Sequence, residues 1–150
     1  MTYQLEFLNK IKGSQVKKAD FAAAFKKGIE ALKKEIGPLM KGGEVHLTLV
    51  DDAEIKEINA EYRNLNRATD VVSLSYFEQE EAQFPTDNLI GEIFISIDTA
   101  ARQAKKQKHS LKKELVFLFV HGLLHVFGYD HLKAGERKIM FALQDKIAKV

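Results

Sequence analysis

Residues 115–131 read Leu-Val-Phe-Leu-Phe-Val-His-Gly-Leu-Leu-His-Val-Phe-Gly-Tyr-Asp-His and contain three of the five histidines in the chain. The nearly continuous apolar run at the start of this segment predicts a helix that is buried on most sides. On such a helix His121 and His125 lie one turn apart and about 40° apart around the axis, so both imidazoles face the same point. Gly128 favours the left-handed conformation that ends a helix, and His131 follows the turn.

The spacing of these histidines predicts a metal site. Three neutral imidazoles without a fourth protein ligand leave one coordination position open, which is typical of catalytic rather than structural zinc. Such an ion lowers the pKa of bound water and polarises a phosphoryl or carbonyl oxygen. We expect one Zn²⁺ per chain, bound by His121, His125 and His131, although nickel or another divalent ion also suits three imidazoles. The alternative is that the three histidines are incidental residues of the core, a helix end and a loop.

The same histidine spacing occurs in metzincin proteases, where a glutamate directly after the first histidine acts as general base. Here that position is Gly122, which cannot transfer a proton. A zinc hydrolase of peptides or small amides is therefore an alternative that the sequence disfavours. His46 and His109 have no histidine neighbours at metal-binding spacing, and we interpret them as structural or surface residues.

Length and composition predict one compact domain over residues 1–150. The chain has no cysteine, so no disulfide framework is possible. It shows no signal peptide, no apolar run long enough for a membrane span, and neither a P-loop nor a dinucleotide fingerprint. We therefore expect a cytoplasmic protein with no membrane partner and no nucleotide cofactor.

The net charge of +2 does not by itself indicate a nucleic-acid partner. The lysines nevertheless gather in three clusters, around residues 10–18, 26–34 and 105–113. Lysine-rich helix faces are more often solvated surface than binding sites. The clusters permit an RNA partner without establishing one.

The hydrophobic pattern predicts four strands, at residues 3–7, 45–50, 71–77 and 90–97. Two helices are expected over residues 16–36 and 134–148. Three more are expected to begin at the caps Asp51, Asp98 and Ser110, and the one capped by Asp51 should end at about Tyr62. The acidic stretch 78–88 is expected to be an exposed loop. This order predicts an α+β domain in which about five helices pack against one four-stranded sheet.

Several segments together resemble the YbeY family of metal-dependent endoribonucleases. They are the motif at 121–131, residues 52–66 with Asn59-x-x-Tyr62-Arg63, the Thr69-Asp70-Val71-Val72-Ser73 stretch, residues 90–93, 114–120 and Met140. The resemblance implies that His121, His125 and His131 bind a zinc-like ion and that Arg63 is a functional arginine. From its position alone, Arg63 is better interpreted as a surface helix residue.

The resemblance also implies a function in ribosomal RNA maturation. We expect a metal-dependent endoribonuclease that cuts single-stranded RNA, acts at the 3′ end of small-subunit ribosomal RNA and in ribosome quality control, and works with the ribosome or ribosomal proteins. Asp130 is expected to cap the turn, or to orient a histidine or relay a proton. An alternative of another class is a ribosome-assembly factor whose metal is mainly structural.

The third strand departs from the family pattern. Members usually follow T-[DN]-V-L-S with Phe-Pro, whereas this chain has Leu74-Ser75. Without the proline the strand is expected to run on towards Tyr76, which changes the rim of the pocket but not the metal ligands.

Overall fold

The computed structural model describes residues 2–37, 40–77, 88–129 and 134–148. Within them, four strands form one sheet, β1 (Tyr3–Asn9), β2 (Gly43–Val50), β3 (Val71–Ser75) and β4 (Leu89–Ser96). The spatial order is β1-β2-β4-β3, with β1, β2 and β4 parallel and β3 antiparallel at one edge. The parallel pairing of β1 with β2 requires a crossover, which the first helix provides.

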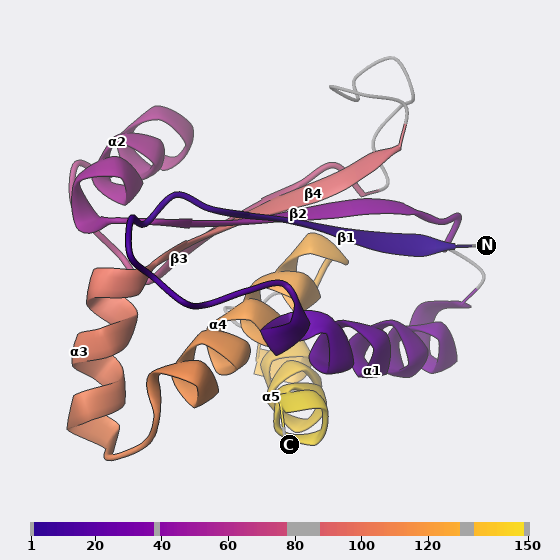
Figure 1. The fold of residues 1–150 in the computed structure, drawn as a ribbon. Coiled ribbons are helices and arrows are strands. Elements are labelled where there is room, and N and C mark those ends of the chain that lie inside the picture. The colour runs from indigo at the N-terminus through magenta and orange to yellow at the C-terminus, as the bar shows by residue number, and fades with distance from the viewer. Residues whose placement is uncertain (1, 38–39, 78–87, 130–133, 149–150) are drawn as a thin grey trace.

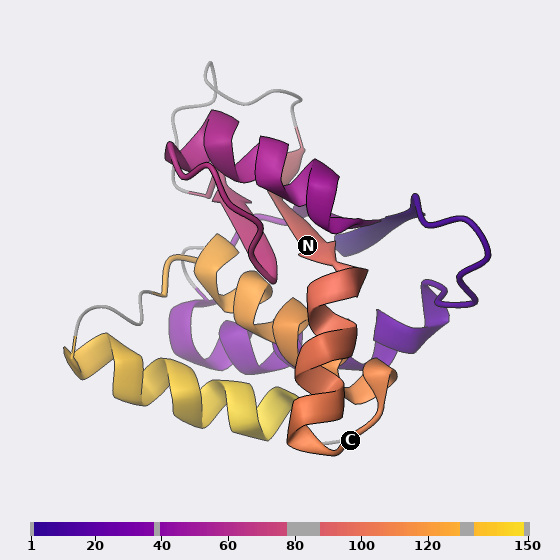
Figure 2. The same cartoon turned by 90° about the vertical axis from the view of Figure 1, so that its left-hand side faces the viewer.

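Five helices are described, α1 (Ala19–Ile36), α2 (Asp52–Arg63), α3 (Ile97–Gln107), α4 (Leu111–Val126) and α5 (Ala134–Ala148). Figure 1 shows α1, α4 and α5 beneath the sheet and α2 on the opposite face. The turned view in Figure 2 confirms that α4 runs between the sheet and α5. The α+β architecture predicted from the sequence is thereby confirmed.

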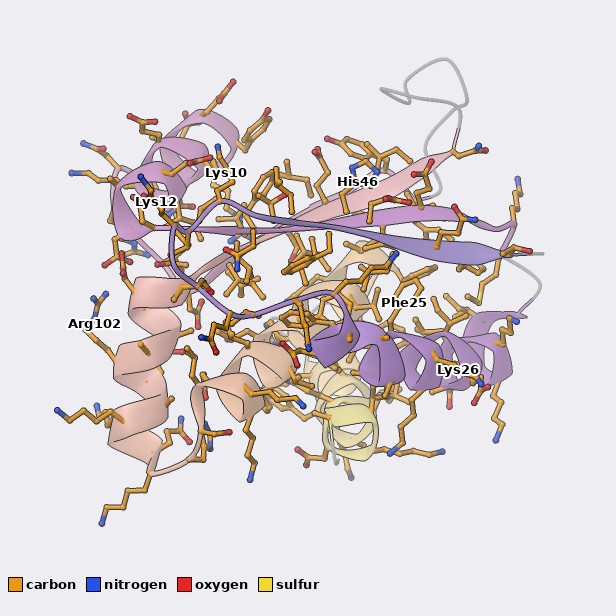
Figure 3. All side chains as sticks on the ribbon, viewed as in Figure 1. Lys10, Lys12, Phe25, Lys26, His46 and Arg102 are labelled. Atoms are coloured by element: carbon orange, nitrogen blue, oxygen red, sulfur yellow. The ribbon has the colours of Figure 1, made fainter. Side chains whose placement is uncertain are left out.

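The main core lies between the sheet and α1, α4 and α5. Phe21 and Phe119 are completely buried, and their rings meet edge to face with centroids 5.5 Å apart. Figure 3 shows Phe25 between α1 and the sheet, whereas His46 lies on the opposite sheet face. A second, smaller core of Val50, Ile55 and Val72 joins α2 to that face. The sheet therefore carries apolar contacts on both faces.

The predicted helix caps are correct in two cases and wrong in one. The Asp51 side chain accepts a hydrogen bond from the backbone N–H of Glu54, and Ser110 caps α4 in the same way through Lys113. For α3 the cap is Ser96, which accepts from Thr99 N, rather than Asp98. The strand runs into the helix without a linker, so Asp98 already lies in the first helical turn.

Several element boundaries also differ from the sequence prediction, and strand β3 ends at Ser75 rather than at residue 77. Helix α1 begins at Ala19 rather than residue 16, because the Asn9 amide donates to the Val16 carbonyl and holds this residue in the loop after β1. Strand β1 continues to Asn9, two residues beyond the predicted end. The predicted loop at 78–88 lies almost entirely outside the described residues.

No helix in the described part of the chain is long and apolar enough to cross a bilayer.

Candidate metal centre

Helix α4 carries the histidine pair through the centre of the domain. Ten of its sixteen residues are buried, which agrees with its predicted position. The helix packs against β3, β4, α1, α3 and α5. Such extensive packing fixes its position, so side chains near its end are held on a rigid element.

The end of α4 is a hydrogen-bonded turn built on Gly128. Helix geometry stops at Val126, and Gly128 has a φ of 100°. The N–H of Gly128 donates to the His125 carbonyl at 3.0 Å, and the N–H of Tyr129 donates to the Leu124 carbonyl at 3.0 Å. These two bonds form a Schellman motif, which confirms the predicted role of Gly128 in ending the helix.

His121 and His125 face each other near the end of α4, as the spacing predicted. Their Nε2 atoms lie 3.1 Å apart, and their ring centroids are 4.7 Å apart with planes inclined at 74°. Both residues are partly buried. The Nδ1 atom of His121 lies 3.1 Å from Oε1 of Gln144 on α5.

This pair fits two positions of a zinc-like ion. Two nitrogens bound at about 2.0–2.1 Å to a tetrahedral ion lie about 3.3 Å apart, close to the observed separation of 3.1 Å. Imidazole nitrogen is a preferred donor for zinc and other borderline ions. His131 and Asp130 lie outside the described residues. Within the described part of the chain no group of three metal-binding side chains occurs, so the third ligand stays a prediction.

Gly122 lies at the closest approach of α4 to the sheet. A Cβ atom built there meets Ile93 Cγ2 and Ser73 Oγ, each at 2.9 Å. A side chain at this position therefore requires that the Ile93 and Ser73 side chains, or the elements that carry them, move. The position that holds the general base in metzincins is thus used here for helix packing, which adds a steric argument against peptide hydrolysis.

The edge strand β3 reaches the end of α4. Ser75 Oγ donates to the carbonyl of Val126 at 2.5 Å. Strand β3 itself ends at Ser75, but the N–H of Tyr76 donates to the Ile90 carbonyl at 2.7 Å, so one hydrogen bond to β4 lies beyond the end of the strand. The sequence analysis gave no role to Ser75 itself.

Two tyrosines, Tyr129 just after the end of α4 and Tyr76 just after the end of β3, keep their protons at neutral pH. Burial, followed by a hydrogen bond to Glu92, raises the pKa of Tyr76 to about 12. Burial also raises the pKa of Tyr129, and the negative charge of Glu35 adds to the increase. Neither phenol can therefore act as a general base near pH 7.

Arg63 is not part of the histidine pair. It is the last residue of α2, is exposed, and belongs to a helix on the opposite sheet face from α4 (Figure 1). Both α2 and α4 pack against the edge strand β3.

The remaining two histidines each lie beside a carboxylate. His46 is 3.5 Å from the Glu44 carboxylate, and His109 is 2.6 Å from the Glu114 carboxylate. These contacts agree with the structural or surface roles predicted for the two histidines.

Gln144 is a site residue that the sequence analysis missed. It is 1% exposed and contacts His121 from α5. A signal was present, since this amide lies in the apolar stripe formed by Met140, Leu143 and Ile147. A polar residue on the buried face of a helix requires a partner.

The fold and the site together define an α+β protein with an HxxxH motif at the end of a buried helix. A model of the family described as Endoribonuclease YbeY matches residues 6–150. The chain therefore belongs to the Endoribonuclease YbeY family.

Curated relatives and a solved structure agree with this assignment. The Endoribonuclease YbeY of Heliobacterium modesticaldum is 43% identical over 126 residues, covering 79% of this chain and 76% of the relative. That of Listeria welshimeri is 43% identical over 116 residues, covering 71% and 72%. The solution structure of TM1509 from Thermotoga maritima is 32% identical, with a TM-score of 0.60 over 97% of this chain and 87% of that one.

Proposed function

We propose that this protein is a metal-dependent endoribonuclease that cuts single-stranded RNA at a site formed by His121, His125 and His131. The observation that carries the proposal is the convergence of the His121 and His125 Nε2 atoms at 3.1 Å. Relatives named as endoribonucleases support RNA as the substrate class. We propose zinc as the ion, one per chain, with nickel as the alternative.

When bound, the ion supplies an electrophile for a phosphoryl oxygen and lowers the pKa of water towards neutrality. The contribution of the chain is to hold the imidazoles in place. The buried helix α4 fixes the backbone of both histidines, and the turn at Gly128 leads the chain towards residue 131.

We assign phosphate binding to Arg63. Its guanidinium is permanently charged and presents several N–H donors to a phosphate. Because Arg63 and the histidines lie on helices on opposite faces of the sheet, an RNA strand that contacts both must pass around the edge strand β3. Exposed lysines, including Lys26 on the outer surface of α1 (Figure 3), supply attraction for the RNA backbone.

The biological substrate that we propose is the 3′ end of small-subunit ribosomal RNA, in maturation and in ribosome quality control. The ribosome or its proteins are the partners that this substrate requires. These assignments follow from the resemblance to the family and not from any feature of the surface.

The test is cleavage of single-stranded RNA by the zinc-loaded protein beside His125→Ala and Arg63→Ala variants purified identically. We expect His125→Ala to lose cleavage and Arg63→Ala to lose on the order of 100-fold, as for other groups that stabilise developing charge. Hydrolysis by an activated water predicts products with 5′-phosphate ends.

Equal cleavage by the wild-type protein and the His125→Ala variant indicates a contaminating nuclease and contradicts the proposal. Uniform 2′,3′-cyclic phosphate ends contradict attack by water. If metal removal only lowers the melting temperature while folded Arg63→Ala retains function in cells, the protein is an assembly factor with a structural metal.

A further inference from the structure

Gln144 is the buried amide that contacts the histidine pair from a different helix. It lies on α5, is 1% exposed, and places Oε1 3.1 Å from Nδ1 of His121. Its neighbours Met140, Leu143 and Ile147 belong to the main core, so its side chain has little freedom to move. It is therefore well placed to fix both the orientation and the protonation of the His121 ring.

The position of the proton on His121 decides whether the imidazole can bind a metal through Nε2. A neutral imidazole carries one proton, on Nδ1 or on Nε2, and only the nitrogen without it can bind a metal. The Nε2 atom of His121 is the one that faces His125. Nδ1 must therefore carry the proton, and its N–H must meet an acceptor.

The Gln144 carbonyl is that acceptor. If the amide were turned over, its NH₂ group would donate to Nδ1 and drive the His121 proton to Nε2, which would block the metal site. Within the described residues Gln144 Nε2 has no hydrogen-bond partner. The tautomer of His121 therefore reports the orientation of the Gln144 amide directly.

We propose that Gln144 is a positioning residue that holds His121 in the Nδ1–H tautomer and thereby leaves Nε2 available to the metal. This inference rests on the proposed metal site but concerns a residue outside the histidine motif. The bond from Gln144 acts as an outer-shell contact of the kind that orients metal-binding histidines in other proteins. In this tautomer His121 Nε2 is the acceptor of the 3.1 Å contact, and the Nε2–H of His125 is then its donor in the metal-free protein.

The variants that test this role are Gln144→Met, which keeps the length of the side chain but removes the acceptor, and Gln144→Glu, which keeps an acceptor. Gln103→Met is the matched control, since Gln103 lies on α3 and bonds to Asp70. Zinc affinity is measured by competition with a chromogenic chelator. We expect Gln144→Met to bind zinc about 10- to 100-fold more weakly, with Gln144→Glu and Gln103→Met close to the wild-type protein.

The tautomer of His121 is measured separately, in metal-free protein at about pH 8, by the pattern of long-range ¹⁵N–¹H couplings of the ring. That pH lies above the ordinary imidazole pKa of about 6.5. We expect the Nδ1–H form in the wild-type protein and in Gln144→Glu, and a mixture of tautomers in Gln144→Met. An Nε2–H form in the wild-type protein overturns the inference without requiring any variant to fold.

The two measurements separate this inference from the proposed function. If the wild-type protein has the Nδ1–H tautomer but binds no zinc, the metal site fails while the positioning role of Gln144 stands. If zinc binds equally well to the wild-type protein and to folded Gln144→Met, the positioning role fails while the metal site stands.

Discussion

At the scale of the single residue, Gly122 decides what chemistry the histidine motif can perform. A glutamate here would provide the general base of a metalloprotease, but a Cβ atom would already approach Ile93 and Ser73 within 2.9 Å. The close contact between α4 and the sheet therefore excludes a large side chain. Catalysis at the proposed metal site would therefore have to rely on groups other than residue 122.

Gly122→Ala should destabilise the protein although alanine favours helices. The gain in helix propensity is about 1 kcal/mol, whereas overpacking a buried contact costs about 1–3 kcal/mol. We expect a net loss of about 1 kcal/mol in the free energy of unfolding, measured by urea denaturation. Because the added methyl group displaces side chains between α4 and the sheet, zinc affinity should also fall.

Gly37→Ala is the matched control for this substitution. Gly37 also has helical φ and ψ angles, and a Cβ atom there meets nothing within 4 Å. Because Pro38 follows and disfavours the helical conformation for an alanine before it, the control should be close to neutral rather than stabilising. If Gly122→Ala is at least as stable as Gly37→Ala, the close packing at α4 is not a constraint.

At the scale of the element, the end of α4 is held by its own turn and by the edge strand. Gly128 closes the last helical turn through local bonds, while Ser75 reaches the Val126 carbonyl from a position 51 residues away in sequence. Val126 follows His125 directly. The contact from Ser75 therefore links the edge strand to the backbone beside a predicted metal ligand.

Ser75→Ala removes the hydroxyl that donates to Val126. A hydrogen bond of this kind contributes about 1 kcal/mol, so we expect a decrease of about 3 °C in the melting temperature of a chain of this size. Calorimetry of the metal-free protein measures this effect without a contribution from the ion. Ser75→Thr keeps the hydroxyl and should restore stability, and equal melting temperatures for the two variants would show that the bond contributes little.

The same contacts show what the sequence could predict and what it could not. The caps at Asp51 and Ser110, the burial of α4 and the turn at Gly128 depend on neighbours within a few residues, and all were predictable. The contacts of Gln144 with His121 and of Ser75 with Val126 depend on how α5 and β3 cross α4. No local pattern determines these crossings, although the polar residue in the apolar stripe of α5 indicated that a partner was needed.

Arg63 illustrates the same limit from the functional side. Its position at the end of a helix predicts only an exposed residue, and the structure agrees. Its proposed role depends on how RNA passes around the edge strand, which neither the sequence pattern nor the protein fold alone determines.

At the scale of the whole molecule, Asp52 connects elements on both faces of the sheet. Its carboxylate accepts hydrogen bonds from Ser96 at 2.6 Å, Thr99 at 2.7 Å and Arg102 at 2.7 Å. These contacts join the start of α2 to the end of β4 and to α3. Burial alone would raise the pKa of Asp52, but the three hydrogen bonds and the positive charge of Arg102 together lower it below the ordinary value of 3.8.

A lowered pKa means that folding favours the ionised form of Asp52. Its contribution to stability is therefore complete above about pH 5 and is lost as the pH falls below 3.8 towards the folded-state pKa. Asp52→Asn should lower the free energy of unfolding by about 1–2 kcal/mol at pH 7. This loss is smaller than that expected for a fully buried charged network, because the side chain of Asp52 is 31% exposed. Urea denaturation at a series of pH values measures the difference between the two proteins. That difference should shrink below pH 3.8, because protonation of the wild-type carboxyl then removes the same charge as the substitution.

Glu57→Gln, which removes an exposed carboxylate from the same helix, should show no comparable loss at pH 7. A pH-independent difference for Asp52→Asn would show that the geometry of the side chain, and not its charge, joins these elements.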